Sequence, residues 1–444
     1  MQSGDDLVIA AIVHRRRLAY QAAKKRQKSG PQGKKRRPRS FFSWRDHLHR
    51  LSPRDFKLRY RLDLESFGHL HSLIVSRIET KNKNQVGAIL FIDVSPQSDE
   101  LVLINMIPPH QARRSRKGGA VSSRVRLAAG LRYLAGGQVT DLACCYHISK
   151  REVYSSLWLV VDAINDHPDF DISFPIDDTE QLKEIELEFA LAHQRRYGTV
   201  SWRGQVGAID GIDIKQKNPG KAVDNPARFY VQRKAGYMLL CIAICDSRRR
   251  FTYYSIGTTA TSHDSLAWDA TKLGQRVSTG DLKRPFFLNG DNAFTSTNSM
   301  VTPMNDSDFD FYQSSNRMAI ECAFGMLVRR WGVFWRPLEV AFDRRTPLVG
   351  AAMRLHNYCI DRRIAIELEQ VAGASLIQPR VWMPTPEFDS EGRPVDFLDT
   401  FDHAAAPFGA NSTREALKKC LSGNLLKRPR EDSYTRAKRA RGVP

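Results

Sequence analysis

Three carboxylates in three local settings are the residues of this chain best suited to act together in chemistry. Asp210 lies inside a strand pattern, Asp291 follows a short apolar run, and Glu321 lies inside a helix pattern. Carboxylates brought close together repel each other unless a divalent cation neutralises them, and hard Mg²⁺ prefers oxygen ligands of this kind. Two such ions can activate a water or a 3′-hydroxyl for in-line displacement at phosphorus. These residue types therefore indicate phosphodiester chemistry, provided that the fold brings the acids together.

Asp210 is the first of these acids and belongs to a predicted strand, Gln205–Lys215. At strand period, the even-numbered residues from Val206 to Ile214 share one face, and Asp210 is the single charge among them. An unpaired buried carboxylate is very costly, so Asp210 needs a cation or strong donors. Taken alone, a structural salt bridge with an arginine is the simpler interpretation. Asp213 falls on the opposite face, where a surface ion pair with Lys215 explains it.

Asp291 and Glu321 also have structural explanations. Asp291 stands just past a short buried-strand pattern at 285–288, where α/β sheets place their sites, although a turn explains Asn-Gly-Asp equally well. Glu321 shares the packing face of a predicted helix, 316–331, with apolar side chains. Its spacing from Arg317 suits an ion pair on that helix.

A fourth acid, Asp264, opens a predicted helix at 266–273. Helix capping is the simplest role for Asp264 and for Ser262. A metal contact is the functional alternative for Asp264.

The order of elements around the acids indicates one fold. Residues 238–245 and 251–256 predict an antiparallel pair of strands, which follows the strand of Asp210. A helix, the strand before Asp291 and the helix of Glu321 complete the order strand–strand–strand–helix–strand–helix. That is the order of an α/β, RNase H-like fold, a mixed sheet flanked by helices, in which these positions converge.

Residues 205–363 resemble the PIF/Harbinger-type DDE transposases, also called DDE superfamily endonucleases. With the upstream motif Arg59–Leu62, the resemblance covers most of residues 55–363 and rests on the order and spacing of several short motifs. The interval between Asp291 and Glu321 is shorter than the family's pattern, and residues 80–120 stand out as an insertion. The motifs are Gly207–Gly211, Arg233–Tyr237, Ser262–Ser265, Asn289–Asp291, Arg317-x-x-x-Glu321-x-x-Phe324-Gly325, Arg329–Trp331 and Leu355–Asn357.

The resemblance implies that Asp210, Asp291 and Glu321 are the catalytic, metal-binding triad. It implies Mg²⁺ as the cofactor, with Mn²⁺ as a substitute, and cleavage and strand transfer at the ends of a double-stranded DNA transposon. The partners it implies are a Myb-like DNA-binding protein and further copies of the chain. The alternative belongs to another class: a domesticated nuclear factor that binds DNA or protein without catalysis.

A helical segment upstream predicts a DNA-binding motif. Two helix patterns, 125–134 and 140–146, precede a third that Ser149 and Glu152 open as a capping box. This arrangement is typical of a helix-turn-helix, and a plain three-helix packing unit explains it equally well. The expected DNA contacts at the third helix are Lys150, Arg151, Tyr154 and Ser155, and those within the family motifs are Arg233, Lys234, Arg329 and Arg330.

The net charge of +20 is concentrated at the two ends of the chain. Residues 1–60 carry 17 Lys and Arg against 4 Asp and Glu, and residues 413–444 carry 10 against 3. Clustered basic residues favour nuclear import or binding to a DNA backbone. No signal peptide or membrane span is expected, because the apolar run Leu7–Val13 is short and has acids before it. The seven cysteines lack zinc-ligand spacing and are expected to be free thiols.

These patterns predict a soluble, nuclear protein with six segments. Further predictions are a helix at 56–76, strands at 86–94 and 101–107, and a helix at 181–195. The segments are a basic tail (1–50), a helical segment with the insertion (51–120), the helix-turn-helix-like region with its connector (121–198), the catalytic domain (199–365), an irregular region (366–412) and a second basic tail (413–444).

Overall fold

The predicted strand Gln205–Lys215 forms as β1 and lies inside a mixed sheet in the computed structural model, which describes residues 42–79, 121–259, 263–364 and 412–428. Neighbouring strands follow the order β2-β3-β1-β5-β6, and a sixth strand, β4, also pairs with β3. The pairs β1–β3 and β3–β4 are antiparallel, whereas β1–β5 and β5–β6 are parallel. The other strands are β2 (Tyr230–Val231), β3 (Gly236–Cys245), β4 (Phe251–Thr259), β5 (Phe287–Asn289) and β6 (Met300–Val301).

The helices of the described residues fall before, within and after this sheet. Short 3₁₀ helices join them: η2 (Pro168–Phe170), η3 (Gly220–Ala222), η4 (Pro226–Phe229), η5 (Gln232–Lys234), η6 (Gly332–Trp335) and η7 (Phe342–Arg344). The α-helices are α2 (Trp44–His49), α3 (Pro53–Tyr60), α4 (Leu64–Ile78), α5 (Ser123–Leu134), α6 (Val139–Cys145), α7 (Lys150–Asn165), α8 (Thr179–Tyr197), α9 (Asp264–Asp269), α10 (Lys272–Ser278), α11 (Ser307–Arg330), α12 (Arg345–Asp361) and α14 (Ser412–Gly423).

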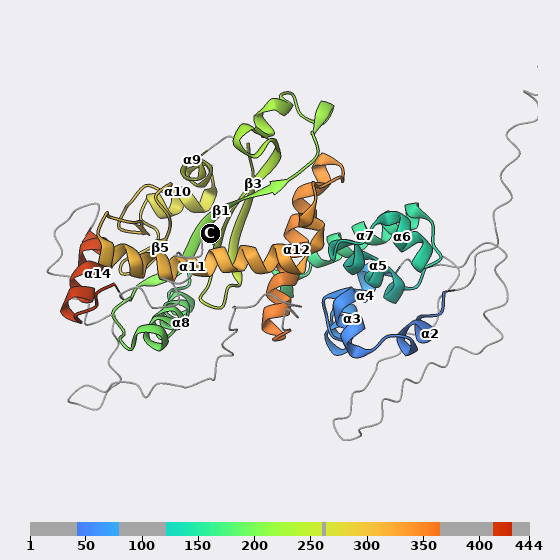
Figure 1. Cartoon of the computed structure of the whole chain (residues 1–444), viewed down its shortest axis with the longest axis horizontal. Coiled ribbons are helices and arrows are strands. Elements are labelled where there is room, and N and C mark those ends of the chain that lie inside the picture. Colours follow the sequence, from blue (N-terminus) through green and yellow to red (C-terminus); the bar gives the residue numbers. More distant parts are fainter. Residues whose placement is uncertain (1–41, 80–120, 260–262, 365–411, 429–444) are drawn as a thin grey trace, which may run out of the picture. The chain divides into compact units, whose positions relative to one another are not determined.

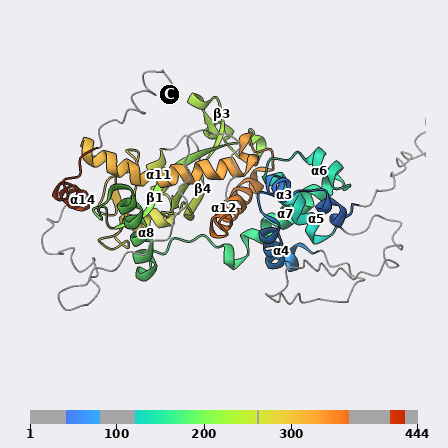
Figure 2. The same cartoon turned by 60° about the horizontal axis from the view of Figure 1, so that its bottom comes forward.

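Two apolar clusters cover the two faces of the sheet. Leu288 of β5 packs with residues of β1, β3, α9 and α10 on one face. Its neighbour Phe287 packs with Trp202 and with residues of α11 and α14 on the other. This alternation is what strand period requires. Figures 1 and 2 both show α11 lying along β1, and the result is a mixed α/β domain consistent with the predicted RNase H-like fold.

Helix α8 leads into the sheet through a buried ion pair. Its Glu186 accepts hydrogen bonds from the Arg203 side chain at 2.6 and 3.1 Å and from the Gly204 backbone N–H at 2.9 Å. The helix predicted at 181–195 forms as α8 and ends at Gly198, whose φ of 79° is the left-handed conformation that glycine adopts most easily. These contacts fix the start of β1, and with it the position of Asp210.

The upstream helices pack into a separate apolar layer. Ser149 Oγ accepts a hydrogen bond from the Glu152 backbone N–H at 3.2 Å, which confirms the predicted start of α7. A four-residue turn, in which His147 has a φ of 53°, separates α6 from α7. Helices α5 and α7 approach closely because Gly130 has no side chain; a Cβ there would lie 3.0 Å from Val160 Cβ.

Several element predictions need correction. The predicted helix 56–76 is two helices, because Arg61 adopts a left-handed φ of 63° and Asp63 caps a new start at α4. The predicted helix 266–273 is likewise interrupted, with Thr271 capping α10. Helix α2 begins at Trp44, inside the segment expected as a tail. The strands predicted at 86–94 and 101–107 lie outside the described residues.

Part of the predicted basic tail 413–444 is a packed helix. Leu417 and Leu421 of α14 are buried in the cluster that contains Trp202. Each such side chain contributes about 1.5–3 kcal/mol when it leaves water. Lys418 also pairs with Asp306 at 3.0 Å. The net positive charge of this segment therefore did not identify its folded part, since the apolar residues of α14 occur only on one face.

All seven cysteines are free, as predicted. Among the helices in the described ranges, none combines the length and the apolar character that crossing a membrane requires.

Candidate active site

The register between β1 and β5 brings Asp210 and Asp291 to the same level of the sheet. Ala208 pairs with Asn289 in this parallel ladder. Asp210 lies two residues after Ala208 in β1, and Asp291 lies two residues after Asn289, just past the end of β5, so the two acids come to the same level of the sheet. Asp291 also forms the turn that the sequence suggested, because its Oδ1 accepts a hydrogen bond from the Ala293 backbone N–H at 2.9 Å.

Asp210 is an acid with little compensation for its burial. Its side chain is 19% exposed, and its Oδ1 accepts one backbone hydrogen bond, from Gly211 at 2.8 Å. Burial, the largest cause, and the charges of Asp291 and Asp264 together raise the pKa of Asp210 to about 6, although the Gly211 N–H and Arg317 act to lower it. A bound cation would relieve this excess of negative charge.

Asp264 lies much closer to this pair than its sequence position suggested. A Cβ placed on Gly211 would stand 2.7 Å from the Asp264 carboxyl carbon, so the carboxylate occupies the space that a side chain at position 211 would take. Burial, and then the charge of Asp291, raise the pKa of Asp264. Asp264 is not the helix cap: the capping position of α9 is His263, which makes no side-chain capping bond, and Ser262 lies outside the described residues. A glycine inside a strand beside a buried acid was the signal that could have ranked Asp264 higher.

Glu321 is held by Arg317, one turn earlier on α11. The guanidinium contacts Glu321 Oε1 at 2.6 Å and Asp210 Oδ2 at 3.5 Å. One arginine thus realises both of the structural ion pairs that the sequence allowed for these acids. Glu321 remains 48% exposed and is not among the charges that shift the pKa of Asp210. The predicted triad is therefore present as an adjacent pair, Asp210 and Asp291, with Glu321 connected to it through Arg317.

The donor chemistry of the site fits a hard divalent cation, although the arrangement is not that of a formed metal site. Across residues 42–79, 121–259, 263–364 and 412–428, no three His, Cys, Asp or Glu side chains are grouped so as to hold a metal ion. The residues that suit such a cation are Asp210, Asp291 and Asp264. The charge of Asp291 acts on both of the other carboxyl groups, and all three offer oxygen ligands. Glu321 could join them only after leaving Arg317.

Asp213 forms an ion pair, but with a different partner from the predicted one. Lys234 Nζ lies 2.8 Å from Asp213 Oδ2, so the surface pairing is correct and Lys215 is not the partner. Arg233, beside Lys234 in η5, is exposed, and its charge lowers the pKa of Asp264. This basic corner is therefore near the acids, where an approaching phosphate backbone would also have to lie.

The other predicted DNA contacts divide by exposure. Lys150, Arg151, Tyr154 and Ser155 are all exposed on the first turns of α7. Arg330 is corrected: it is 3% exposed and donates a hydrogen bond to the Ile364 carbonyl at 2.9 Å, so it has no surface to offer DNA. Arg329, its neighbour, is exposed.

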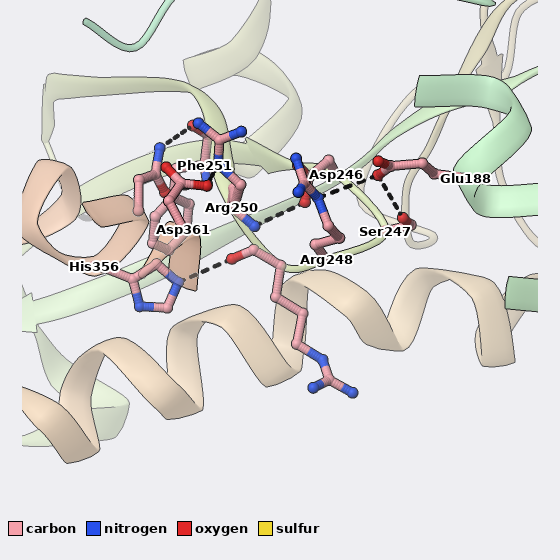
Figure 3. A network of polar contacts seen from close by, with 10 residues as sticks. Glu188, Asp246, Ser247, Arg248, Arg250, Phe251, His356 and Asp361 are labelled. Carbon is pink, nitrogen blue, oxygen red and sulfur yellow. Dashed lines mark hydrogen bonds and ion pairs between the residues drawn. The ribbon is translucent and has the colours of Figure 1, made fainter. Parts of the chain in front are cut away.

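A second polar cluster lies at the turn between β3 and β4 and includes two residues that recur in the family motifs. Asn357 donates to the Phe251 carbonyl and accepts from the Phe251 N–H, both at 2.8 Å. His356 bonds to the Arg249 carbonyl at 2.8 Å, and burial lowers its pKa to about 3. Figure 3 shows this cluster continuing through Arg250 and Asp246 to Glu188. His356 and Asn357 therefore hold α12 to β4 and to the turn before it.

One family model covers the part of the chain that contains the four acids. Residues 209–357 match the family model described as DDE superfamily endonuclease. That range begins beside Asp210 and contains Asp264, Asp291 and Glu321. No solved structure matches the chain.

Curated relatives extend the similarity beyond the matched domain. They carry the name "Putative nuclease HARBI1" in Rattus norvegicus, Homo sapiens and Mus musculus. The rat protein is 22% identical over 285 residues, the human protein 21% over 281 and the mouse protein 24% over 285. Each alignment covers 61% of this chain and 77% of the relative.

Proposed function

The chain belongs to the DDE superfamily endonucleases through residues 209–357, and from that premise we propose that it is a divalent-metal-dependent DNA endonuclease of the transposase type. The observation that supports this most is the alignment of Asp210 with Asp291, which follows from the pairing of Ala208 with Asn289, and the nearby charge of Asp264. A bound cation would neutralise the half-buried negative charge that these acids place there.

Asp210, Asp291 and Glu321, with Asp264, are the residues that would hold Mg²⁺ or its substitute Mn²⁺. When bound, the metal would supply charge neutralisation at the attacking and leaving oxygens of an in-line displacement. Arg317 already gives Glu321 and Asp210 a shared positive partner. Its role in this proposal is to hold Glu321 beside the site until the carboxylate turns to the metal.

The proposed substrate is double-stranded DNA at transposon ends, and strand transfer follows cleavage. Helices α6 and α7, joined by their four-residue turn, would act as a helix-turn-helix that places the first turn of α7 in a groove. Lys150 and Arg151 would contact phosphates or base edges there. The double substitution Lys150→Ala and Arg151→Ala should weaken binding about tenfold at low salt and flatten its salt dependence. Unchanged binding in a fluorescence-anisotropy titration would favour the plain three-helix packing unit.

A nicking assay on oligonucleotides carrying the element ends tests the catalytic proposal. Asp210→Ala, Asp291→Ala and Glu321→Ala should each abolish Mg²⁺-dependent cutting, while circular dichroism shows the fold unchanged. Asp264→Ala separates a metal contact from a structural role: a large loss of cutting with an intact fold supports the former. Full activity of the Glu321→Ala protein would remove Glu321 from the triad.

The second candidate function is DNA or protein binding without catalysis. The Arg317–Glu321 contact favours it, because an acid that stays paired with arginine cannot ligate metal. Stable complexes with the element ends, together with no cutting in Mg²⁺ or Mn²⁺, would support this function.

The basic ends of the chain support a nuclear location and partners that carry negative charge. We propose nuclear import and salt-sensitive DNA affinity for residues 1–40, and association with a Myb-like protein or further copies of the chain at the transposon end. Deletion of residues 1–40 should move the protein out of the nucleus and reduce the salt dependence of DNA binding. Unchanged localisation and an unchanged salt slope would contradict the import and DNA-binding roles.

A further inference from the structure

Three buried side-chain amides are linked by hydrogen bonds next to the turn that carries Asp291. Gln205 of β1, Asn289 of β5 and Gln313 of α11 are each 0% exposed. Gln205 Oε1 accepts hydrogen bonds from Trp202 Nε1 at 2.6 Å and from Asn289 Nδ2 at 3.3 Å. Asn289 Nδ2 also donates to the Gln313 backbone carbonyl at 3.1 Å. These amides therefore join the two acid-bearing strands to the acid-bearing helix.

Gln313 makes the contact closest to the site. Its Nε2 donates to Asn289 Oδ1 at 2.8 Å and to the Gly290 carbonyl at 2.6 Å. Gly290 is buried, and a Cβ there would lie 3.1–3.3 Å from Met300 and Ile209. The residue that follows it is Asp291, so the Gln313 amide holds the peptide from which that carboxylate extends.

The position of Gln313 on α11 extends this contact to the other acids. Gln313, Arg317 and Glu321 are spaced by four residues and lie on one face of the helix. Gln313 grips the turn of Asp291, Arg317 contacts Asp210, and Glu321 completes the stripe. One face of α11 therefore contacts both the turn that carries Asp291 and the strand that carries Asp210.

Packing alone does not account for these amides. They are surrounded by the apolar cluster of Trp202, Phe287 and Phe309, where hydrophobic side chains would cost less. Two polar atoms, Gln205 Nε2 and Gln313 Oε1, have no hydrogen-bond partner within the described part of the chain. Each such atom has lost its hydrogen bonds to water without replacing them, which destabilises the folded state. The network therefore lowers the stability of the fold, while its hydrogen bonds fix the relative positions of β1, β5 and α11.

We propose that Gln313 and Asn289 are positioning residues, which hold the Gly290–Asp291 turn against α11 and thereby fix the Asp291 carboxylate for metal binding. This inference rests on the proposed metal-dependent function. It adds that metal affinity depends on a buried amide contact that never touches the metal.

The test compares Mn²⁺ binding to the full-length chain by isothermal titration calorimetry. Gln313→Met keeps the volume of the side chain but removes both donated hydrogen bonds. Its Mn²⁺ dissociation constant should rise about tenfold, the lower end of the usual effect of losing an outer partner of a metal ligand. Gln313→Asn, which keeps the amide but shortens its reach by one methylene, should weaken binding in the same direction and serves if Gln313→Met does not fold.

Asn316→Leu is the matched control on the same helix. Asn316 is also buried, and its side-chain amide bonds to His193 at 3.1 Å and to the Tyr312 carbonyl at 2.8 Å, neither of which belongs to β1, β5 or the Asp291 turn. It should lower the melting temperature like Gln313→Met while changing the Mn²⁺ dissociation constant less than about twofold. Equal changes in the two variants, or no change in either, would overturn the positioning role. A wild-type chain that binds no Mn²⁺ and cuts no DNA would instead overturn the proposed function itself.

Discussion

Asp210 and Asp246 are two buried aspartates whose pKa is raised to about 6, yet their surroundings differ in sign. Burial is the largest cause of the raised pKa at both positions. Asp246 accepts a backbone hydrogen bond from Arg250, and the charges of Arg250 and Arg248 lower its pKa against the single opposing charge of Glu188. Among the charges that act on Asp246, the two arginines therefore outnumber the one acid, Glu188. Arg250 is also paired with a third acid of the cluster in Figure 3, Asp361, at 3.1 Å.

Around Asp210 the balance is reversed. Arg317 is the arginine whose charge lowers the pKa of Asp210, and it is shared with Glu321, while two further aspartates raise that pKa. Since both aspartates have a raised pKa, that property alone does not identify a metal-binding acid. What distinguishes the candidate active site is negative charge left without its own cation.

The largest expected difference between the two aspartates is in catalysis. Asp210→Asn should lower Mg²⁺-dependent cleavage at least about 10³-fold, because losing a metal ligand costs several kcal/mol of transition-state stabilisation. Asp246→Asn should stay within about threefold of wild type. Single-turnover nicking rates at saturating Mg²⁺ measure both. A comparable loss in a folded Asp246→Asn protein would erase the distinction.

The next difference is the response of stability to metal. At a concentration one hundred times its dissociation constant, a bound ion stabilises the folded state by about 2.7 kcal/mol, which corresponds to roughly 5–10 °C in melting temperature. Wild type and Asp246→Asn should both gain this amount in Mg²⁺, as measured by scanning fluorimetry, and Asp210→Asn should gain almost nothing. Stabilisation of the Asp210→Asn protein by Mg²⁺ would place the ion elsewhere.

A smaller difference is expected in the pH dependence of stability without metal. The raised pKa means that the folded state binds the Asp210 proton more tightly than the unfolded chain does. The Asp210 carboxyl group therefore contributes most to the free energy of unfolding below about pH 4. This contribution declines as pH rises from about 4 to 6, by up to about 1.4 kcal/mol per pH unit. Asp210→Asn should remove this decline and be the more stable protein at pH 7 in EDTA.

Asp246→Asn should gain less at pH 7, because Arg248 and Arg250 then lose an anionic partner. Urea unfolding between pH 4 and 7.5 measures the effect of both substitutions. Identical pH profiles for wild type and Asp210→Asn would show that the Asp210 carboxylate is already compensated in the folded chain.

The smallest effect concerns the rim of the Asp246 cluster. Arg248 and Glu188 are 53% and 39% exposed and lie 3.4 Å apart. Such pairs contribute about 0–1 kcal/mol, so Arg248→Ala should lower the free energy of unfolding by less than about 1 kcal/mol. Cleavage should remain at the wild-type rate. A loss of activity here would mean that the second cluster also serves the reaction.

Local patterns accounted for most elements that position the site. The alternation in Gln205–Lys215 predicted β1, and the capping box at Ser149 predicted the start of α7. Predictions were wrong where one residue redirects the chain, as at Arg61, or where burial depends on distant partners, as for Arg330 and α14. These outcomes depend on contacts that sequence periodicity does not contain.

The sequence by itself determined which side chains could form a site: strand period left Asp210 as the single charge on its face, and four-residue spacing placed Glu321 beside Arg317. Only the tertiary structure decided how they meet. The pairing of Ala208 with Asn289 aligned Asp210 with Asp291, and the open space at Gly211 admitted Asp264. The physical reason is range: periodicity governs neighbours along one element, whereas register and close approach are set by packing between elements far apart in the chain.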